Sequence, residues 1–249
     1  MNIESETAQS GGNSGSNCGV MMTNNEFEVN YSVRCMQLVN QLTPNENENF
    51  GPSKALGAPT GTGLNAGSLD VFVIGRQKNA WFWHETAKAI NQDGPDFVVY
   101  ENGFKYSGGV FRDLGWLEVS AGGASSDPDQ WEWYSWQLPV NFTASLIEST
   151  DNLVGKNTVN VNKSCNPLNP REQSAGGDLF DLAEAKKITN RGDGNPLNFI
   201  FGETLNTDTT PIKYFRVYDG GSYIEDGTET NIDNGIDIDA ICIFNYSDS

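Results

Sequence analysis

The sequence of this 249-residue chain predicts an all-β protein, a β-sandwich with one or two short helices. Short apolar or alternating runs recur along the chain, and turn-rich spacers separate them at fairly regular intervals, as in sandwich folds. The 27 Gly and 10 Pro suit many tight turns, and the 13 Phe, 8 Tyr and 6 Trp supply bulky side chains for a core. We therefore expect a single domain over residues 25–249, behind a disordered leader over residues 1–24 that is rich in Ser, Gly and Asn.

The predicted elements follow from the pattern of apolar residues. Alternation of apolar and polar residues over 116–120 and 213–219 is typical of half-buried strands. Residues 97–100, Phe-Val-Val-Tyr, are β-branched or aromatic throughout, which is typical of a strand buried on both faces. Good helix formers over residues 181–187 predict one short helix, capped by Asp178 or Asp181, with metal or ligand contact as the alternative role of these carboxylates. In chain order, the predicted strands span residues 27–39, 69–74, 80–83, 97–100, 116–120, 131–138, 213–219 and 236–245.

The charge of the chain narrows the class of partner. With 33 acidic against 15 basic residues, the formal net charge is −18, which excludes a nucleic-acid-binding surface and argues against docking on anionic lipid. No stretch approaches the roughly 20 apolar residues of a membrane span, so we predict no transmembrane segment. The acidic surplus suits solubility and cation binding, although an acidic surface that is merely solvated explains most of it equally well.

The four cysteines are Cys18, Cys35, Cys165 and Cys242. They form no CxxC pair and show no ligand spacing, which argues against a zinc site. An even number permits disulfides, but Cys35 and Cys242 both lie in apolar runs that predict strands, where buried free thiols are an equal alternative. The sequence shows no secretory hydrophobic region, so the chain as given is either cytosolic or already processed.

An ordered series of motifs spans most of the chain. They are Ala55-Leu56-Gly57-Ala58-Pro59, Asp93-Gly94-Pro95-Asp96-Phe97-Val98-Val99-Tyr100-Glu101-Asn102, Trp116-Leu117-Glu118-Val119-Ser120, Ala175-Gly176-Gly177-Asp178-Leu179-Phe180-Asp181-Leu182, Tyr214-Phe215-Arg216-Val217 and Gly235-Ile236-Asp237-Ile238-Asp239-Ala240-Ile241. In this order they resemble a family of bacterial, including spirochaetal, cell-surface proteins and lipoproteins. The later motifs are similar to the last strands of galactose-binding-like, discoidin-type jelly rolls, whose final strand bears an acidic residue that often helps to hold a structural calcium.

The resemblance implies a secreted or surface-attached jelly roll at the outer face of a bacterial cell. The chain departs from the lipoprotein pattern, because it shows neither a signal nor a lipidated cysteine. These motifs therefore give no support for a lipid anchor.

Carboxylates near two predicted strands suggest a calcium site. Asp237 and Asp239 are two residues apart, so on a strand they point the same way, and a cation between them would relieve their repulsion. Calcium takes about six to eight oxygen ligands, so the loop at residues 57–62 and the ends of the strand at 97–100 are expected to contribute. The alternative is that these side chains face solvent or cap turns. The predicted calcium ligands are Asp237, Asp239, Asp93, Asp96, Glu101, Asn102 and Thr60.

The run Trp131-Glu132-Trp133-Tyr134-Ser135-Trp136 is aromatic on both faces of its predicted strand. Exposed Trp and Tyr stack on the apolar faces of sugar rings, whereas buried ones pack a sandwich core. We therefore list Trp131, Trp133, Trp136 and Tyr134 as candidate ligand-binding residues, with core packing as the alternative. No catalytic residue is predicted, because His84 is the only histidine and no nucleophile signature accompanies a Ser or Cys.

These observations predict a non-catalytic secreted or surface-attached β-sandwich, stabilised by calcium, that binds carbohydrate or a host or envelope protein in the manner of an adhesin. Two alternatives stay open. One is a glycan-active hydrolase that uses paired carboxylates, and the other is a purely structural envelope module.

Overall fold

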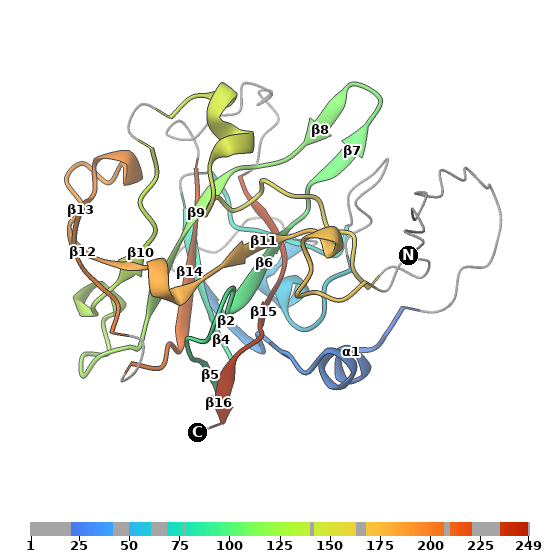
Figure 1. Ribbon diagram of the computed structural model, residues 1–249, viewed down its shortest axis with the longest axis horizontal. Coiled ribbons are helices and arrows are strands. Elements are labelled where there is room, and N and C mark those ends of the chain that lie inside the picture. The colour runs from blue at the N-terminus through green and yellow to red at the C-terminus, as the bar shows by residue number, and fades with distance from the viewer. Residues whose placement is uncertain are drawn as a thin grey trace, which may run out of the picture.

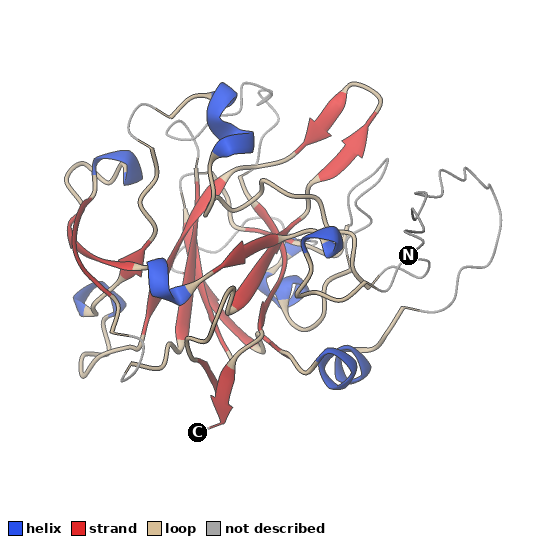
Figure 2. Ribbon diagram, viewed as in Figure 1, coloured by secondary structure: helices blue, strands red, loops and turns tan. Residues whose placement is uncertain are grey.

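The computed structural model describes residues 21–41, 50–60, 69–76, 78–139, 142–162, 168–206, 210–220 and 235–248. Over these residues the protein is an all-β sandwich whose strands pair antiparallel in two main sheets (Figure 1, Figure 2). The sandwich class predicted from the sequence is confirmed. Among the described residues, no helix is long and apolar enough to cross a membrane.

The smaller main sheet has five strands. Across the sheet they are β1 (Arg34–Cys35), β15 (Asp237–Ile243), β6 (Phe97–Glu101) and β11 (Asp178–Phe180), and β3 (Phe72–Val73) pairs with the start of β15. The larger sheet has seven strands. In order they are β13 (Ile200–Thr204), β12 (Lys186–Asn190), β10 (Tyr134–Ser135), β9 (Gly115–Ser120), β14 (Tyr214–Asp219), β4 (Asn79–Trp83) and β2 (Leu38–Gln41).

The remaining elements lie around these sheets. Two strand pairs stand apart from them, β5 (Ala87–Ala89) with β16 (Tyr246–Asp248) and β7 (Phe104–Tyr106) with β8 (Gly109–Phe111). The helical segments are α1 (Asn24–Tyr31) and the short 3-10 helices η2 (Pro52–Ala55), η3 (Pro128–Gln130), η4 (Ala144–Ser149), η5 (Gln173–Ala175), η6 (Leu182–Glu184) and η7 (Pro196–Asn198).

The main core fills the space between the two sheets. Phe97 and Val99 of β6 lie in one buried cluster with Leu117 of β9 and Phe215 of β14. The ring of Phe97 meets that of Phe215 edge-on, with centroids 4.9 Å apart. Burying one such side chain stabilises the fold by about 1.5–3 kcal/mol, so this layer holds the sheets together.

Strand β6 is buried on its other face as well. Val98 and Tyr100 belong to a second buried cluster, together with Phe27 of α1. All five residues of β6 are buried. The prediction of a strand covered on both faces is therefore confirmed.

A disulfide joins β1 to β15. Cys35 and Cys242 are direct partners in the antiparallel register, and their sulfur atoms are bonded. Of the two arrangements that the sequence allowed for these cysteines, the disulfide is therefore present. It closes a separation of 207 residues, and disulfides of this kind contribute about 2–5 kcal/mol. Cys18 and Cys165 lie outside the described residues.

The predicted strand at residues 27–39 is wrong in its first part. Thr23 and Glu26 form a reciprocal capping box that starts α1, and Ser32 ends the helix in the left-handed conformation. The chain becomes extended only at Arg34. Residues 1–20 of the predicted leader lie outside the described residues, and Asn24 is the first residue of α1.

Two further predictions of secondary structure need correction. The segment at 131–138 contains only the two-residue strand β10, because η3 precedes it and Trp131 caps that turn. The helix expected at 181–187 is one 3-10 turn, after which Lys186 begins β12. Pairing of β12 with β10 and β13 overrides the local helix propensity. Asp181 is the N-cap, since its side chain accepts a hydrogen bond from the Ala183 amide at 2.8 Å.

Candidate functional site

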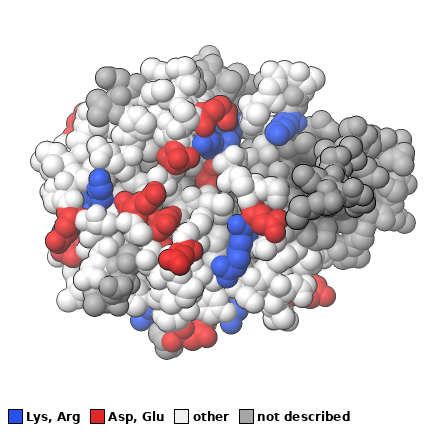
Figure 3. Space-filling model, in the orientation of Figure 1, with Lys and Arg blue, Asp and Glu red and all other residues white. Residues whose placement is uncertain are grey.

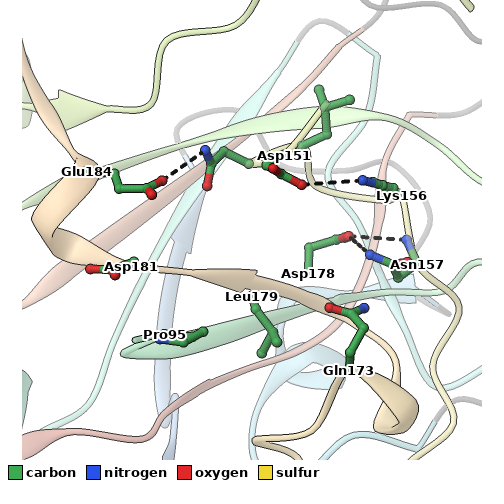
Figure 4. A pocket seen from close by; sticks show the side chains of 11 residues that line it. Pro95, Asp151, Lys156, Asn157, Gln173, Asp178, Leu179, Asp181 and Glu184 are labelled. Atoms are coloured by element: carbon green, nitrogen blue, oxygen red, sulfur yellow. Dashed lines mark hydrogen bonds and ion pairs between the residues drawn. The ribbon is translucent and has the colours of Figure 1, made fainter. Parts of the chain in front are cut away.

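A groove of about 570 Å³ runs beside β11, the edge strand of the five-stranded sheet (Figure 4). Its walls come from the loop at residues 151–157 and from the turns η5 and η6 on either side of β11. Figure 3 shows several acidic side chains across the middle of the face on which Figure 1 places β11. The lining residues are Pro95, Asp151, Asn152, Leu153, Lys156, Asn157, Gln173, Asp178, Leu179, Asp181 and Glu184.

The groove mixes hydrogen-bond acceptors, donors and small apolar surfaces. Asp151 and Glu184 are exposed carboxylates, and Lys156 lies 3.6 Å from Asp151. The Lys156 ammonium also donates to the Thr150 carbonyl at 3.1 Å, which holds it at the wall. Figure 4 shows Glu184 at one end of the groove and Gln173 toward the other. Because acceptors, donors and apolar atoms all line it, the groove suits a ligand with many hydroxyl groups.

Asp178 forms part of the groove where β11 begins. Only 4% of the residue is exposed, and its carboxylate accepts from the Gly155 amide at 2.7 Å and the Asn157 side chain at 2.9 Å. Burial raises the pKa of Asp178 to about 7, against the lowering effect of these hydrogen bonds. Asp178 thus ties the loop at 151–157 to the sheet.

Gly155 allows the loop to pass close to its neighbours. It has φ +87°, and a Cβ atom there would lie 2.0 Å from the carbonyl oxygen of Asp113 and 3.4 Å from Cγ of Glu101. Any side chain would therefore collide with the segment before β9. The glycine brings the groove wall against a second carboxylate, Glu101.

Glu101 is the last residue of β6 and points into the interior of the sandwich. It is 1% exposed, and neither side-chain oxygen has a hydrogen-bond partner among the described residues. Burial raises the pKa of the Glu101 carboxyl well above its usual range, and the charges of Asp113, Asp237 and Asp178 raise it further. The nearby Asp113 amide offsets a small part of this shift without forming a well-aligned hydrogen bond. We call Glu101, Asp113, Asp178 and Asp237 the acidic cluster.

Two of the predicted calcium ligands meet as expected. The Thr60 amide donates to both carboxylate oxygens of Asp239 at 2.9 Å, and the Thr60 hydroxyl donates to one of them, also at 2.9 Å. The register of β15 shifts between Ile238 and Ala240, which interrupts the expected alternation. The charge of Asp239 acts on Tyr100, whereas that of Asp237 acts on Glu101.

The seven predicted ligands do not form one site, which corrects that expectation. Asp96 precedes β6 and Glu101 ends it, so about 16 Å of extended strand separates them. Asp96 is fully buried, and its oxygens accept from the Gln92 and Leu182 amides and from the Asn245 side chain, at 2.8–2.9 Å. It therefore ties neighbouring segments together.

Asp93 and Asn102 lie in different environments. Asp93 is exposed to solvent. Asn102 follows Glu101, and its amide donates to the Asp237 carbonyl at 2.9 Å. Within the described ranges, no three Asp, Glu, His or Cys side chains are grouped so as to hold a metal ion by themselves.

The aromatic candidates are mostly interior. Trp136 and Tyr134 belong to the main core, where the Trp136 ring meets that of Phe180 at 4.9 Å. The Trp133 ring covers the guanidinium of Arg216 at 3.7 Å and is 3% exposed. Only Trp131 is half-exposed, with its ring 4.5 Å from that of Tyr214. The prediction of an aromatic sugar platform therefore narrows to Trp131, because a ligand does not reach the other three rings.

A buried ion pair lies beneath Trp133 in the seven-stranded sheet. Glu118 of β9 is completely buried, and it accepts from Arg216 at 2.7 and 3.0 Å and from Arg191 at 2.7 Å. Arg216 also donates to Asp129 of η3 at 3.2 Å. This network satisfies the charge of Glu118 with two guanidinium groups.

Several of these residues carried no signal in the sequence. Asp178 was predicted as a helix cap, with metal or ligand contact as the alternative, and Asp113, Asp151 and Lys156 follow no recognisable motif. Their proximity depends on pairing between segments far apart in the chain. No family model, curated protein or solved structure matches this chain.

Proposed function

We propose that this protein is a non-catalytic, secreted or surface-attached binding module that takes carbohydrate in the groove beside β11. The groove is the observation on which this proposal rests. Its volume of about 570 Å³ falls within the usual range of ligand sites, and its lining pairs carboxylates and amides with one ammonium group and small apolar surfaces. Sugar hydroxyls both donate and accept hydrogen bonds, and sugar C–H groups need apolar contact, so each kind of lining atom has a counterpart.

The disulfide supports the extracytoplasmic location in this proposal. The Cys35–Cys242 disulfide joins two central elements of the fold, and disulfides persist mainly in oxidising compartments. The net charge of −18 disfavours anionic ligands in the groove and favours neutral or cationic ones. A neutral glycan fits both observations.

A glycan hydrolase is the second candidate, and one observation favours it. Asp178 has a pKa raised to about 7, as a general acid requires, and it lies in the same groove as Glu184. Against it, the loop at 151–157 already engages both oxygens of Asp178 with N–H donors. We therefore give Asp178 a structural role and treat turnover as the distinguishing result.

A panel of glycans separates the candidates. The full chain is tested for retention of each glycan and for release of reducing ends. We expect retention without turnover, weakened at least tenfold by Glu184→Gln and Asp151→Asn, which remove exposed acceptors from the groove. Glu203→Gln, an exposed carboxylate on β13 of the other sheet, is the matched control and should leave retention unchanged.

The other outcomes assign the other functions. Turnover that Asp178→Asn abolishes would establish the hydrolase. Absence of both retention and turnover would leave the structural envelope module, and retention of envelope or host protein alone would replace carbohydrate as the ligand. Calcium stabilisation, which the sequence predicts, belongs to the same proposal and raises the melting temperature through binding to the folded state.

A further inference from the structure

We propose that His84 is a pH-sensitive switch, whose protonation opens the start of β5 in mild acid. His84 is the only histidine in the chain, and it lies in the turn between β4 and β5. No described lining residue of the groove beside β11 comes from β4, β5 or this turn. Protonation of His84 is therefore independent of the proposed glycan site and goes beyond the proposed function.

The side chain of His84 closes its own turn. Its Nδ1 atom accepts hydrogen bonds from the backbone amides of Thr86 at 3.2 Å and Ala87 at 2.9 Å. Only 4% of the residue is exposed, so water has little access to these bonds. Because Ala87 is the first residue of β5, the imidazole fixes where the strand begins.

These contacts also fix the protonation state of the imidazole. An Nδ1 atom that accepts two N–H groups carries no proton, so the ring is neutral and its single proton is on Nε2. In the imidazolium form both nitrogen atoms are donors, and the Nδ1 proton would point at two amide hydrogens. The closed turn and the protonated ring therefore exclude each other.

The second ring nitrogen gives no compensation. Nε2 is buried and has no hydrogen-bond partner within the part of the chain that the structure describes. In the closed turn, neither proton of an imidazolium ring would meet an acceptor there. Burial accordingly lowers the pKa of His84, and the charge of Glu28 offsets only part of this effect.

The charges around the turn favour the protonated ring once the turn opens. Three carboxylates and one guanidinium act on His84, and they come from different elements. The guanidinium of Arg34 lies over the ring of Tyr246, 4.6 Å from its centroid. An imidazolium released from its buried position gains hydration and attraction to the carboxylates. The charged groups are Glu28 of α1, Arg34 of β1, Asp248 of β16 and Glu85 of the turn itself.

The opening is confined to one end of β5. At that end Ala87 pairs with Asp248 of β16. At the other end Ala89 and Ile212 exchange two backbone hydrogen bonds of 2.8 Å, which involve no titratable group. Figure 1 shows β5 and β16 together at the lower edge of the view, and they pair outside the two main sheets. Acid therefore loosens one end of this strand pair and leaves the sandwich folded.

The direction of the pH effect follows from the lowered pKa of His84. The ring of the open turn titrates near the ordinary value of 6.5, whereas the closed turn holds the neutral ring to lower pH. Closure is therefore complete above pH 6.5 and is lost as the pH falls below that value. The ratio of open to closed turn rises by at most about tenfold for each pH unit. Because the opening is local, its effect on the free energy of unfolding cannot exceed the free energy of opening the turn.

Hydrogen exchange of the full chain, followed by NMR between pH 5 and 8, tests this switch. After correction for the intrinsic effect of pH, protection of the Ala87 amide should fall by up to about tenfold per pH unit below 6.5. The Ala89 amide, bonded to Ile212, is the internal control and should keep its protection. His84→Asn supplies a carbonyl oxygen that accepts the same amides without titrating, so protection of Ala87 should no longer depend on pH. His84→Leu, which lacks an acceptor, should lose that protection at every pH.

The single histidine also gives a direct measurement of its own protonation. Its imidazole nitrogen signals should show the Nε2–H form at pH 7, and their titration should coincide with the loss of Ala87 protection. An Nδ1–H form at pH 7, or protection of Ala87 that does not change with pH, would overturn the proposal. The same loss of protection in His84→Asn would also overturn it, by assigning the opening to the carboxylates. If a variant does not fold, the imidazole signals and amide protection of the wild type decide between these outcomes.

Discussion

Two buried glutamates, one in each main sheet, have opposite surroundings. Glu118 in β9 is completely buried and accepts hydrogen bonds from Arg216 and Arg191. Glu101 in β6 is 1% exposed, and the charges that act on it are those of acidic side chains. The same residue type, equally buried, thus has two guanidinium partners in one sheet and no hydrogen-bond partner among the described residues in the other.

This difference separates a structural carboxylate from a candidate site. The guanidinium groups around Glu118 are themselves covered by aromatic rings, Trp133 over Arg216 and Phe199 over Arg191. That network is complete without a ligand. At Glu101, by contrast, neither side-chain oxygen has a hydrogen-bond partner among the described residues, and the side chain lies against the wall of the groove at Gly155.

The largest expected effect on stability comes from removing Arg216 from the ion-pair network around Glu118. Arg216→Met should lower the free energy of unfolding by about 3–5 kcal/mol, because it leaves Glu118 buried with only the partly exposed Arg191. Chemical denaturation measures the loss. The double variant Glu118→Leu with Arg216→Met should recover much of it, since it removes both charges. A loss below about 1 kcal/mol for the single variant would show that Glu118 does not depend on Arg216.

Features that depend on neighbouring residues in the chain can be predicted from the sequence, whereas those that depend on contacts between distant segments cannot. The burial of β6 was predictable because four successive residues, 97–100, carry their own local signal, and the disulfide was one of two arrangements left open. The helix α1 was missed although Thr23 and Glu26 show a capping box, because the apolar alternation after Phe27 was given more weight. Local signals that conflict are resolved only by the packing around them.

The sites depend on register between distant segments, which composition does not encode. Glu118 meets Arg216 because β9 pairs with β14 in one register, and a shift of one residue would turn them to opposite faces. Thr60 and Asp239 were predicted as members of one set, and they do meet across 179 residues. Glu101 and Asp96 were placed in the same set although β6 holds them at opposite ends.

The expected effect of pH on stability is of intermediate size. The folded-state pKa of Asp178 is raised from 3.8 to about 7, so between these values the native state binds a proton that the unfolded state has lost. Stability from this group is therefore complete below about pH 4 and is lost as the pH rises toward 7, by at most about 1.4 kcal/mol per pH unit. In calcium-free buffer, Asp178→Asn should flatten this slope.

The matched control for the slope is Glu203→Gln, an exposed carboxylate in the seven-stranded sheet, which should leave it unchanged. The slope is obtained from denaturation midpoints between pH 4 and 8. Stability that rises with pH over this interval in the wild type would contradict the raised pKa of Asp178. A slope that Asp178→Asn does not alter would assign the titration to another group of the protein.

The smallest expected effect decides which sheet carries the ligand. Trp131 is half-exposed, stacks on Trp133 at 6.0 Å and donates its indole N–H to the Ser125 carbonyl at 2.7 Å. Because it lies on the seven-stranded side, Trp131→Ala should cost about 1 kcal/mol of stability and leave glycan retention unchanged. Retention that Trp131→Ala abolishes but Glu184→Gln preserves would move the ligand from the groove to the aromatic side. The seven-stranded sheet would then carry a binding surface beside its complete ion network.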